Sequence, residues 1–294
     1  MENFKLVSDY RENEKLRDSF NQLAKATFQI DFSKWFNKGY WTDKYVPYSL
    51  TNQNGDIIAN ASIFKMNIVI DHVSYNAIQI GTVMTDVRYR NKGLSKILMT
   101  EIMNAQKDYC DFIYLFANES VLEFFPRFGF SRVDESEYSL KIHNSHLNIA
   151  MKTDIRKLDV DSDIILLETT AINRYVNKSK IIVENNEELL MFYYLVVFPE
   201  SIYYISELEA VVLMELEERT LHIFDIISTK EQDTYTVLSK VVDEKMEHVV
   251  FHFEPDHIKG LHVEKVQTDD DALFYLSTSP VLEGHFKFPI TSHC

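Results

Sequence analysis

The N-terminal part of the chain carries hydrophobic residues at helical spacing. Between residues 11 and 28, charged residues separate four apolar side chains at near-helical intervals: Leu16, Phe20, Leu23 and Phe28. A period close to 3.6 residues predicts an amphipathic helix. We therefore expect the first fifty residues to be mostly helical.

The pattern then changes to the alternation that is typical of strands. After a turn signal at residues 52–56, residues 57–70 and 73–87 alternate apolar with polar side chains and are rich in β-branched residues. They predict two long strands. The short turn at Asp71 and His72 makes these strands antiparallel neighbours.

A strand–helix–strand unit follows. Apolar side chains line one face of a predicted helix at residues 95–107: Leu94, Ile97, Leu98, Ile102 and Ala105. Residues 112–117 are a continuous apolar run of strand length, which indicates a buried, parallel strand. Together with the strand before the helix, they predict a right-handed crossover.

The second half repeats this order of elements. Strands are predicted at residues 201–206, 210–218, 221–228 and 248–253, and a helix at residues 235–244. Laid over the first half without gaps, the second copy has Asp233 for Arg90 and Thr236 for Gly93. Either the second copy has lost the cation and the glycine, or the likeness is chance. A polar segment near residue 145 divides the chain into domains at 1–145 and 146–294.

The composition is that of a globular protein, and the length fits two domains of ordinary size. The 294 residues carry a formal net charge of −15, which argues against nucleic acid as a partner because nucleic acids select basic surfaces. The charge suits a cationic small substrate, or it only keeps the protein in solution. The N-terminus has no signal-peptide pattern, and the longest apolar run, residues 189–198, is too short to span a membrane. We expect a cytoplasmic protein with no membrane partner, whose two cysteines are free thiols.

Residues 86–98 combine a glycine and a helix start with four cations: Arg88, Arg90, Lys92 and Lys96. A helix N-terminus offers unpaired N–H groups to an anion, and Gly93 lets the backbone approach a phosphate closely. Ser95 is expected to cap the helix or to bond a phosphate oxygen. Neither the P-loop nor the Rossmann glycine pattern is present. The stretch taken alone fits either a pyrophosphate site or a basic turn.

Residues 80–99 resemble the acetyl-CoA-binding motif of the GNAT acetyltransferase superfamily, in which an Arg/Gln-x-x-Gly-x-Gly/Ala loop opens the third helix. Residues 115–130 resemble the fifth strand, the Asn-containing turn and the closing Gly-Phe pair of that family. The resemblance covers about residues 55–140. It implies a GNAT fold with a mixed central sheet, followed by a second, GNAT-like α/β domain that lacks the pyrophosphate loop.

The resemblance also implies roles for residues of this chain. Val83, Met84 and Thr85 match the strand whose backbone pairs with the pantetheine arm, and the Val83 N–H matches the donor that polarises the thioester carbonyl. Asn118 matches an Asn that steadies the coenzyme. The pyrophosphate loop is matched by Arg90, Asn91, Lys92, Gly93, Leu94, Ser95 and Lys96. Acetyl-CoA is the implied co-substrate.

Two positions depart from the family pattern. The family often has a Tyr as general acid four residues before the Gly of the Gly-Phe pair, where this chain has Phe125. Some members use a Glu on the fourth strand as base, where this chain has Gln79. Neither side chain titrates, so the general acid and base stay unassigned, and water can carry the protons instead.

The acceptor site is predicted less sharply. In a GNAT fold the aromatic-rich residues 34–50 would overhang it, and Trp41, Asp43 and Tyr45 are the candidate substrate-binding residues. Ordinary packing of these rings is the alternative. The histidines form no metal-binding pattern, so we expect no metal. Residues 285–294 would reach the acceptor site only if they packed back against the first domain.

The leading prediction is an N-acetyltransferase that moves the acetyl group of acetyl-CoA to a primary amine of a small molecule or a peptide by direct attack. The second domain would cover one side of the acceptor cleft or provide the surface of a homodimer. The alternative is a non-catalytic sensor or partner-binding module that binds acetyl-CoA or CoA. The missing Tyr and Glu favour that alternative.

Overall fold

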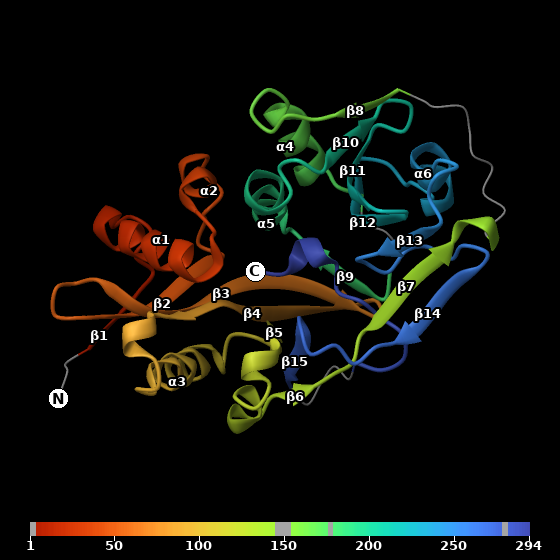
Figure 1. Ribbon diagram of the computed structural model, residues 1–294. Helices are drawn as coiled ribbons and strands as arrows, with labels where there is room; N and C mark the ends of the chain where they lie inside the picture. The colour runs from red at the N-terminus through yellow and green to blue at the C-terminus, as the bar shows by residue number, and fades with distance from the viewer. Residues whose placement is uncertain (1–3, 145–153, 176–178, 278–281) are drawn as a thin grey trace.

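Two mixed β-sheets with helices on their faces make up the protein (Figure 1). The computed structural model describes residues 4–144, 154–175, 179–277 and 282–294. The predicted domain boundary between residues 145 and 146 lies outside these ranges.

The first sheet carries helices on both faces. Within the described residues its eight strands are β1 (Lys5–Ser8), β2 (Tyr45–Thr51), β3 (Ile57–Ile70), β4 (Val73–Thr85), β5 (Phe112–Ala117), β15 (Ala272–Leu276) and β6 (Ser131–Arg132) in spatial order, with β9 (Ile181–Glu184) also paired to β3. Helices α1 (Glu14–Phe28) and α2 (Ser33–Asn37) lie on one face and α3 (Leu94–Gln106) on the other (Figure 1). Strands β4 and β5, joined by α3, are parallel, as the strand–helix–strand pattern predicts.

Local patterns predicted the centre of this sheet well. The β3–β4 hairpin is confirmed, and Asp71 and His72 at its turn have φ of 48° and 68°. These left-handed angles are the ones a two-residue type I′ turn requires. The expectation of a mostly helical N-terminal region was wrong for β1 and β2. Strand β2 was concealed by Pro47, because a residue without an N–H group argues against a strand.

The second sheet repeats the arrangement of the first. Within the described residues its seven strands are β14 (Leu261–Lys265), β7 (Ser136–Lys141), β13 (His248–Phe251), β12 (Thr220–Ser228), β11 (Ala210–Glu217), β10 (Ile202–Ile205) and β8 (Ile155–Lys157) in spatial order. Its helices are α4 (Ile164–Ile172), α5 (Glu187–Phe192), which continues as a π-helical turn over Tyr193–Val197, and α6 (Thr234–Val241). Short 3₁₀ turns complete the fold at Val87–Tyr89, Glu119–Val121, Phe125–Phe128, Ile142–Asn144 and Ile290–Ser292.

The two sheets exchange strands across the predicted boundary. Strand β7, from the first half of the sequence, pairs with β13 and β14 in the second sheet. Strand β15, from the end of the sequence, lies between β5 and β6 in the first sheet. Each sheet therefore contains strands from both halves of the chain, and residues near the C-terminus return to the first sheet.

The second strand–helix–strand unit lacks an open phosphate loop. Strands β12 and β13 are parallel and joined by α6, as β4 and β5 are by α3. Asp233 is the N-cap of α6, and its carboxylate accepts hydrogen bonds from the N–H groups of Tyr235 (3.3 Å) and Thr236 (3.2 Å). An acidic cap occupies the donors that an anion would need. The gapless sequence comparison aligned Asp233 with Arg90. In the structure Asp233 is the N-cap of α6, the position that Gly93 has on α3.

His252, directly after β13, provides a test of this part of the fold. Its ring lies 3.1 Å from that of His222, measured from Nε2 to Nδ1, and burial followed by the charge of His222 lowers the pKa of His252 to about 4. An unfolded His titrates near 6.5, so the unfolded chain binds more protons between pH 6.5 and 4. The contribution of His252 to the free energy of unfolding is therefore complete above pH 6.5 and is lost as the pH falls toward 4.

We therefore expect the free energy of unfolding of the wild type to fall more steeply over this interval than that of His252→Gln. Urea denaturation at a series of pH values measures both slopes. Equal slopes would contradict the burial of a neutral His252.

Candidate active site

Strand β4 is interrupted by a β-bulge. Two of its residues, Thr82 and Val83, lie opposite a single residue of β3, Ala61. Thr82 has a left-handed φ of 49°, and its carbonyl accepts a hydrogen bond of 2.9 Å from the buried amide of Asn60. A bulge takes a residue out of the ladder and turns the strand. The backbone at Val83 thus departs from regular pairing at the position where the resemblance expects the carbonyl-polarising donor.

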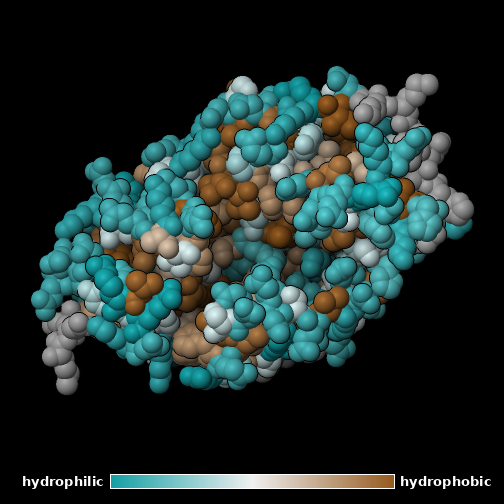
Figure 2. All heavy atoms as spheres, in the orientation of Figure 1, coloured by the Kyte–Doolittle hydropathy of each residue, from teal (hydrophilic) through white to brown (hydrophobic). Residues whose placement is uncertain are grey.

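Strands β4 and β5 separate just before the bulge. Their parallel pairing ends at Ile80 and Leu115 in the described structure, although both strands continue. Residues 81–83 and 116–118 then line opposite sides of a cavity of about 530 Å³. In the same orientation as Figure 1, Figure 2 shows hydrophobic residues around a hollow in the middle of the molecule. A slot between two splayed strands can admit an extended ligand that pairs with the free strand edge.

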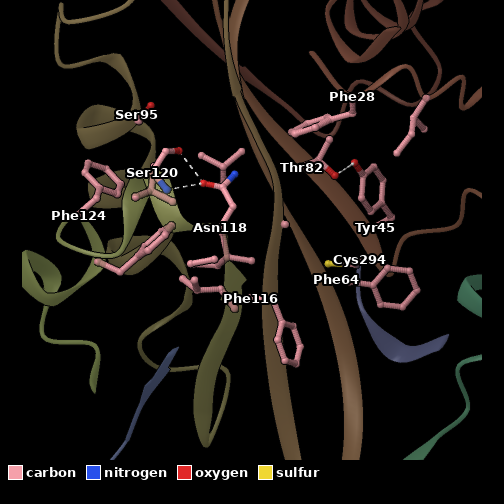
Figure 3. Close-up of a pocket in the computed structure, with 18 of the residues that line it drawn as sticks. Phe28, Tyr45, Phe64, Thr82, Ser95, Phe116, Asn118, Ser120, Phe124 and Cys294 are labelled. Atoms are coloured by element: carbon pink, nitrogen blue, oxygen red, sulfur yellow. Dashed lines mark hydrogen bonds between the residues drawn. The ribbon is translucent and has the colours of Figure 1, made fainter. Parts of the chain in front are cut away.

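The cavity has two sides (Figure 3). One side is formed by residues that include Ser95, Asn118, Ser120 and Phe124, and the other by residues that include Phe28, Tyr45, Phe64, Thr82 and Cys294. Asn118 is oriented by Ser120, whose N–H and hydroxyl donate to its Oδ1 at 3.1 and 2.6 Å. Three of the predicted coenzyme residues, Val83, Ser95 and Asn118, line the cavity itself.

The loop between β4 and α3 is open at the helix N-terminus. Gly93 is the N-cap of α3 with φ 76° and no side-chain cap, and Asn91 has φ 62°. Of the two roles expected of Ser95, capping the helix was wrong, because Ser95 is the second helical residue and its Oγ lies 3.2 Å from Oγ1 of Thr85. The first N–H groups of α3 therefore have no side-chain cap, in contrast to those of α6. A bond from Ser95 to a phosphate oxygen stays a prediction.

The cations of this loop differ in their surroundings. Arg88 is paired with Asp86 at 2.6 Å, and this hydrogen-bonded partner lowers the pKa of Asp86. Arg90 donates from Nε to the carbonyl of Thr85 at 3.4 Å, and the Lys92 ammonium lies 4.8 Å from the centre of the Tyr89 ring.

The predicted coenzyme residues that do not line the cavity differ in their exposure. Exposed are Arg90, Asn91, Lys92, Gly93 and Lys96, buried are Met84 and Leu94, and Thr85 is half-buried.

The predicted acceptor residues are only partly brought together. Tyr45 lines the cavity and donates from its hydroxyl to Oγ1 of Thr82 at 3.0 Å, and burial raises its pKa above the usual range. Trp41 packs behind it, with its indole N–H on the Tyr45 carbonyl at 3.2 Å, and Asp43 is exposed. Neither Trp41 nor Asp43 lines the cavity. Trp35, from the same aromatic segment, does.

Residues 286–294 pack back against the first sheet and reach the cavity. The Phe288 N–H donates to the buried carboxylate of Glu135 at 2.7 Å, and the Thr291 hydroxyl donates to Asp225. The His293 ring stacks on Phe116 with 3.5 Å between ring centres. The segment ends with Cys294 in the cavity wall, where burial raises the pKa of its thiol.

Gly81 makes this approach of the chain possible. A Cβ atom at Gly81 would lie 2.0 Å from the carbonyl oxygen of Cys294. Sequence reasoning did not single out Gly81. It did expect residues 285–294 to reach the site if they packed back against the first domain, and Cys294 lines the cavity in this way.

The two departures from the family pattern lie on different sides of β4. Phe125 is buried, lines the cavity and packs against Phe124 and Phe274. Gln79 is also buried, does not line the cavity, and has a side-chain oxygen without a hydrogen-bond partner in the described structure. The titratable side chains that do line the cavity are Tyr45, Glu123, Arg127 and Cys294.

No helix within the described ranges has the length and apolar character needed to cross a membrane.

The second half of the chain covers one side of the cavity through Leu189 and Phe192 of α5, together with Cys294. This side of the cavity is thus built jointly by both halves of the sequence.

Comparisons with known proteins agree with this geometry. The family model described as an acetyltransferase (GNAT) domain matches residues 10–133, and no curated protein matches the sequence. Among solved structures, a conserved protein from Enterococcus faecalis described as a probable N-acyltransferase aligns over 93% of this chain and 72% of its own, at 12% identity and a TM-score of 0.61.

Two further structures align over both sheets. A GCN5-related N-acetyltransferase from Kribbella flavida covers 93% of this chain and 71% of its own, at 12% identity and a TM-score of 0.57. Eis1 from Mycobacterium abscessus covers 94% and 73%, at 12% identity and a TM-score of 0.58. At such identities the likeness shows the fold, while the family match comes from residues 10–133. The family match thus identifies residues 10–133 as similar to a GNAT acetyltransferase domain, and the structural likeness shows that this fold extends over both sheets.

Proposed function

We propose that the protein transfers the acetyl group of acetyl-CoA to a primary amine. The observation that carries the proposal is the separation of β4 from β5 beside the uncapped N-terminus of α3. The slot suits an extended pantetheine arm, and the helix end suits the pyrophosphate to which that arm is joined. Both features belong to one cavity, through Val83 and Ser95.

Named residues would hold the coenzyme. The backbone of residues 91–96 would receive the pyrophosphate, with Arg90, Lys92 and Lys96 adding positive charge in a chain that is otherwise acidic. The strand edge of Val83, Met84 and Thr85 would pair with the arm, and Asn118 would face it from β5. The left-handed Asn91 and Gly93 support this, because alternating backbone conformations turn successive N–H groups toward one anion.

The reaction needs no covalent enzyme intermediate. The amine nitrogen attacks the thioester carbonyl carbon, the C–N bond forms as the C–S bond breaks, and the coenzyme leaves as a thiolate. The Val83 N–H would stabilise the developing oxyanion, an effect of about 3 kcal/mol in other acyl transfers. The proton released by the amine passes to water, and water protonates the thiolate.

A coenzyme-binding module without turnover is the second candidate. The side chains at the usual acid and base positions, Phe125 and Gln79, cannot titrate, and this observation favours it. Incubation with acetyl-CoA and a panel of amines, with free thiol followed over time, separates the two functions. Thiol release that depends on an amine supports the transferase. Tight binding of acetyl-CoA in calorimetry, without thiol release above background for any amine, supports the module.

Phe125→Tyr tests where the proton transfer takes place. A hydroxyl at this cavity-lining position would give the leaving thiolate a proton donor, and a positioned donor contributes about 100-fold or more in other enzymes. Since water already supplies the proton, we expect a smaller gain, roughly tenfold in kcat, with the dissociation constant of acetyl-CoA unchanged. An unchanged kcat would mean that the leaving sulfur lies away from residue 125.

A further inference from the structure

The acceptor side of the cavity is a wall of apolar side chains. It is built by Phe28, Ile30, Phe32, Trp35, Leu189 and Phe192, and we call these six residues the apolar wall. Phe32 stacks on Phe192 with 5.1 Å between ring centres, and Trp35 meets Phe192 edge-on at 5.6 Å. Trp35 is only 1% exposed, whereas Phe28 is 41% exposed at the mouth. The rings thus support one another and present hydrocarbon to the cavity.

Polar groups in and near this wall are already bonded. The Trp35 indole N–H donates to the Glu188 carbonyl at 2.7 Å, and the Tyr45 hydroxyl donates to Thr82. The carboxylate of Glu188 lies outside the cavity lining and pairs with Lys44 at 2.7 Å. The wall therefore offers an incoming cation no carboxylate of its own.

The charged residues of the cavity lie on the other side. Among the described lining residues, Glu123 and Arg127 are the only ones whose side chains carry a formal charge at neutral pH. Both flank Phe124 in the segment after β5, the side on which Ser120 and Asn118 lie (Figure 3). A single carboxylate and a single guanidinium, of opposite charge, do not make an acidic pocket that would select a polycation.

We propose that the acceptor is a primary amine that carries an aromatic or comparably bulky apolar group, and this inference rests on the transferase function proposed above. The group packs against the apolar wall, and the amine projects toward Val83. Desolvation by the wall lowers the pKa of the bound amine and so favours its neutral, nucleophilic form. A second ammonium packed against the apolar wall would find no carboxylate among the six residues of that wall. The acidity of the chain as a whole thus does not select a polyamine.

The test compares phenethylamine and tryptamine with spermidine and kanamycin, at a fixed acetyl-CoA concentration and with free thiol as the readout. We expect kcat/KM for the two aromatic amines to exceed that for the two polycations by at least about 100-fold. Equal or faster turnover of the polycations would overturn the inference and leave the transferase function standing.

Absence of thiol release with every amine would overturn the transferase function instead. Calorimetry of phenethylamine with the CoA-saturated protein then decides the acceptor class separately. Binding of phenethylamine in preference to spermidine would support the apolar wall as a recognition site, and the reverse order would overturn it.

Phe28→Ala tests the wall at its exposed end. Because Phe28 is 41% exposed, its truncation should leave the fold intact, and we expect a roughly tenfold increase in KM for phenethylamine with KM for acetyl-CoA unchanged. Tyr109→Ala, at a residue 79% exposed and outside this cavity, is the matched control and should change neither constant. An unchanged KM for phenethylamine in Phe28→Ala would overturn the assignment of the wall.

Discussion

Gly93→Val is expected to weaken acetyl-CoA binding by at least about 100-fold while the protein stays folded. Gly93 has φ 76° and a Cβ there would meet no protein atom within 4 Å, so the valine side chain would project into the space that the pyrophosphate is expected to use. Loss of two charge-assisted hydrogen bonds at about 1.5 kcal/mol each amounts to about 3 kcal/mol, which is roughly a 100-fold change in dissociation constant.

The chain contains a matched control for this substitution. Gly39, which follows α2, has φ 87° and likewise no protein atom within 4 Å of a Cβ. Both valine variants should therefore lose a similar free energy of unfolding, about 1–2 kcal/mol from the left-handed backbone. Calorimetry with acetyl-CoA should separate them, with Gly39→Val binding like the wild type. Wild-type affinity in Gly93→Val would remove the pyrophosphate from this loop.

Gly81→Ala is expected to expel Cys294 from the cavity wall. The new Cβ would lie 2.0 Å from the oxygen and 2.6 Å from the carbonyl carbon of Cys294, and backbone atoms cannot move aside as a flexible side chain can. Overpacking of this severity costs about 3 kcal/mol in unfolding free energy. The proposed acceptor side would lose the part of the cavity wall that Cys294 forms. We therefore also expect the rate of acyl transfer to fall at least about tenfold.

Deletion of Cys294 supplies the control for Gly81→Ala. If the clash is with Cys294, the alanine should cost the shortened chain less than about 0.5 kcal/mol, because the two changes remove the same contact. Urea denaturation of the wild type, the two single variants and the double variant gives the coupling energy. Additive losses would show that Gly81 is needed for another reason.

How much of the fold could be predicted depended on how local its determinants are. The β3–β4 hairpin, α3 and β5 were predicted because periodicity and a two-residue turn lie within a short stretch of sequence. The exchange of β7 and β15 could not be predicted, because the partners of these strands are chosen by contacts between residues more than a hundred positions apart.

The candidate site, too, could be predicted only where its residues are close together in the sequence. The loop at Arg90 to Lys96 is a contiguous motif, and its open helix end was expected from Gly93 and the cations around it. The proposed acceptor side joins Trp35, Phe192 and Cys294, which no spacing rule connects. The candidates Trp41 and Asp43 were chosen for lying in an aromatic segment. They lie in the connection between α2 and β2, where no periodicity in the sequence shows which side chains face the cavity.

A crystal structure of the complex with coenzyme A is the most direct test of the proposed coenzyme site. We expect the pyrophosphate within hydrogen-bonding distance of the N–H groups of residues 91–96, and the pantetheine arm between β4 and β5 along Val83. Electron density for the coenzyme elsewhere on the protein, with the slot between these strands closed by protein atoms, would contradict the assignment.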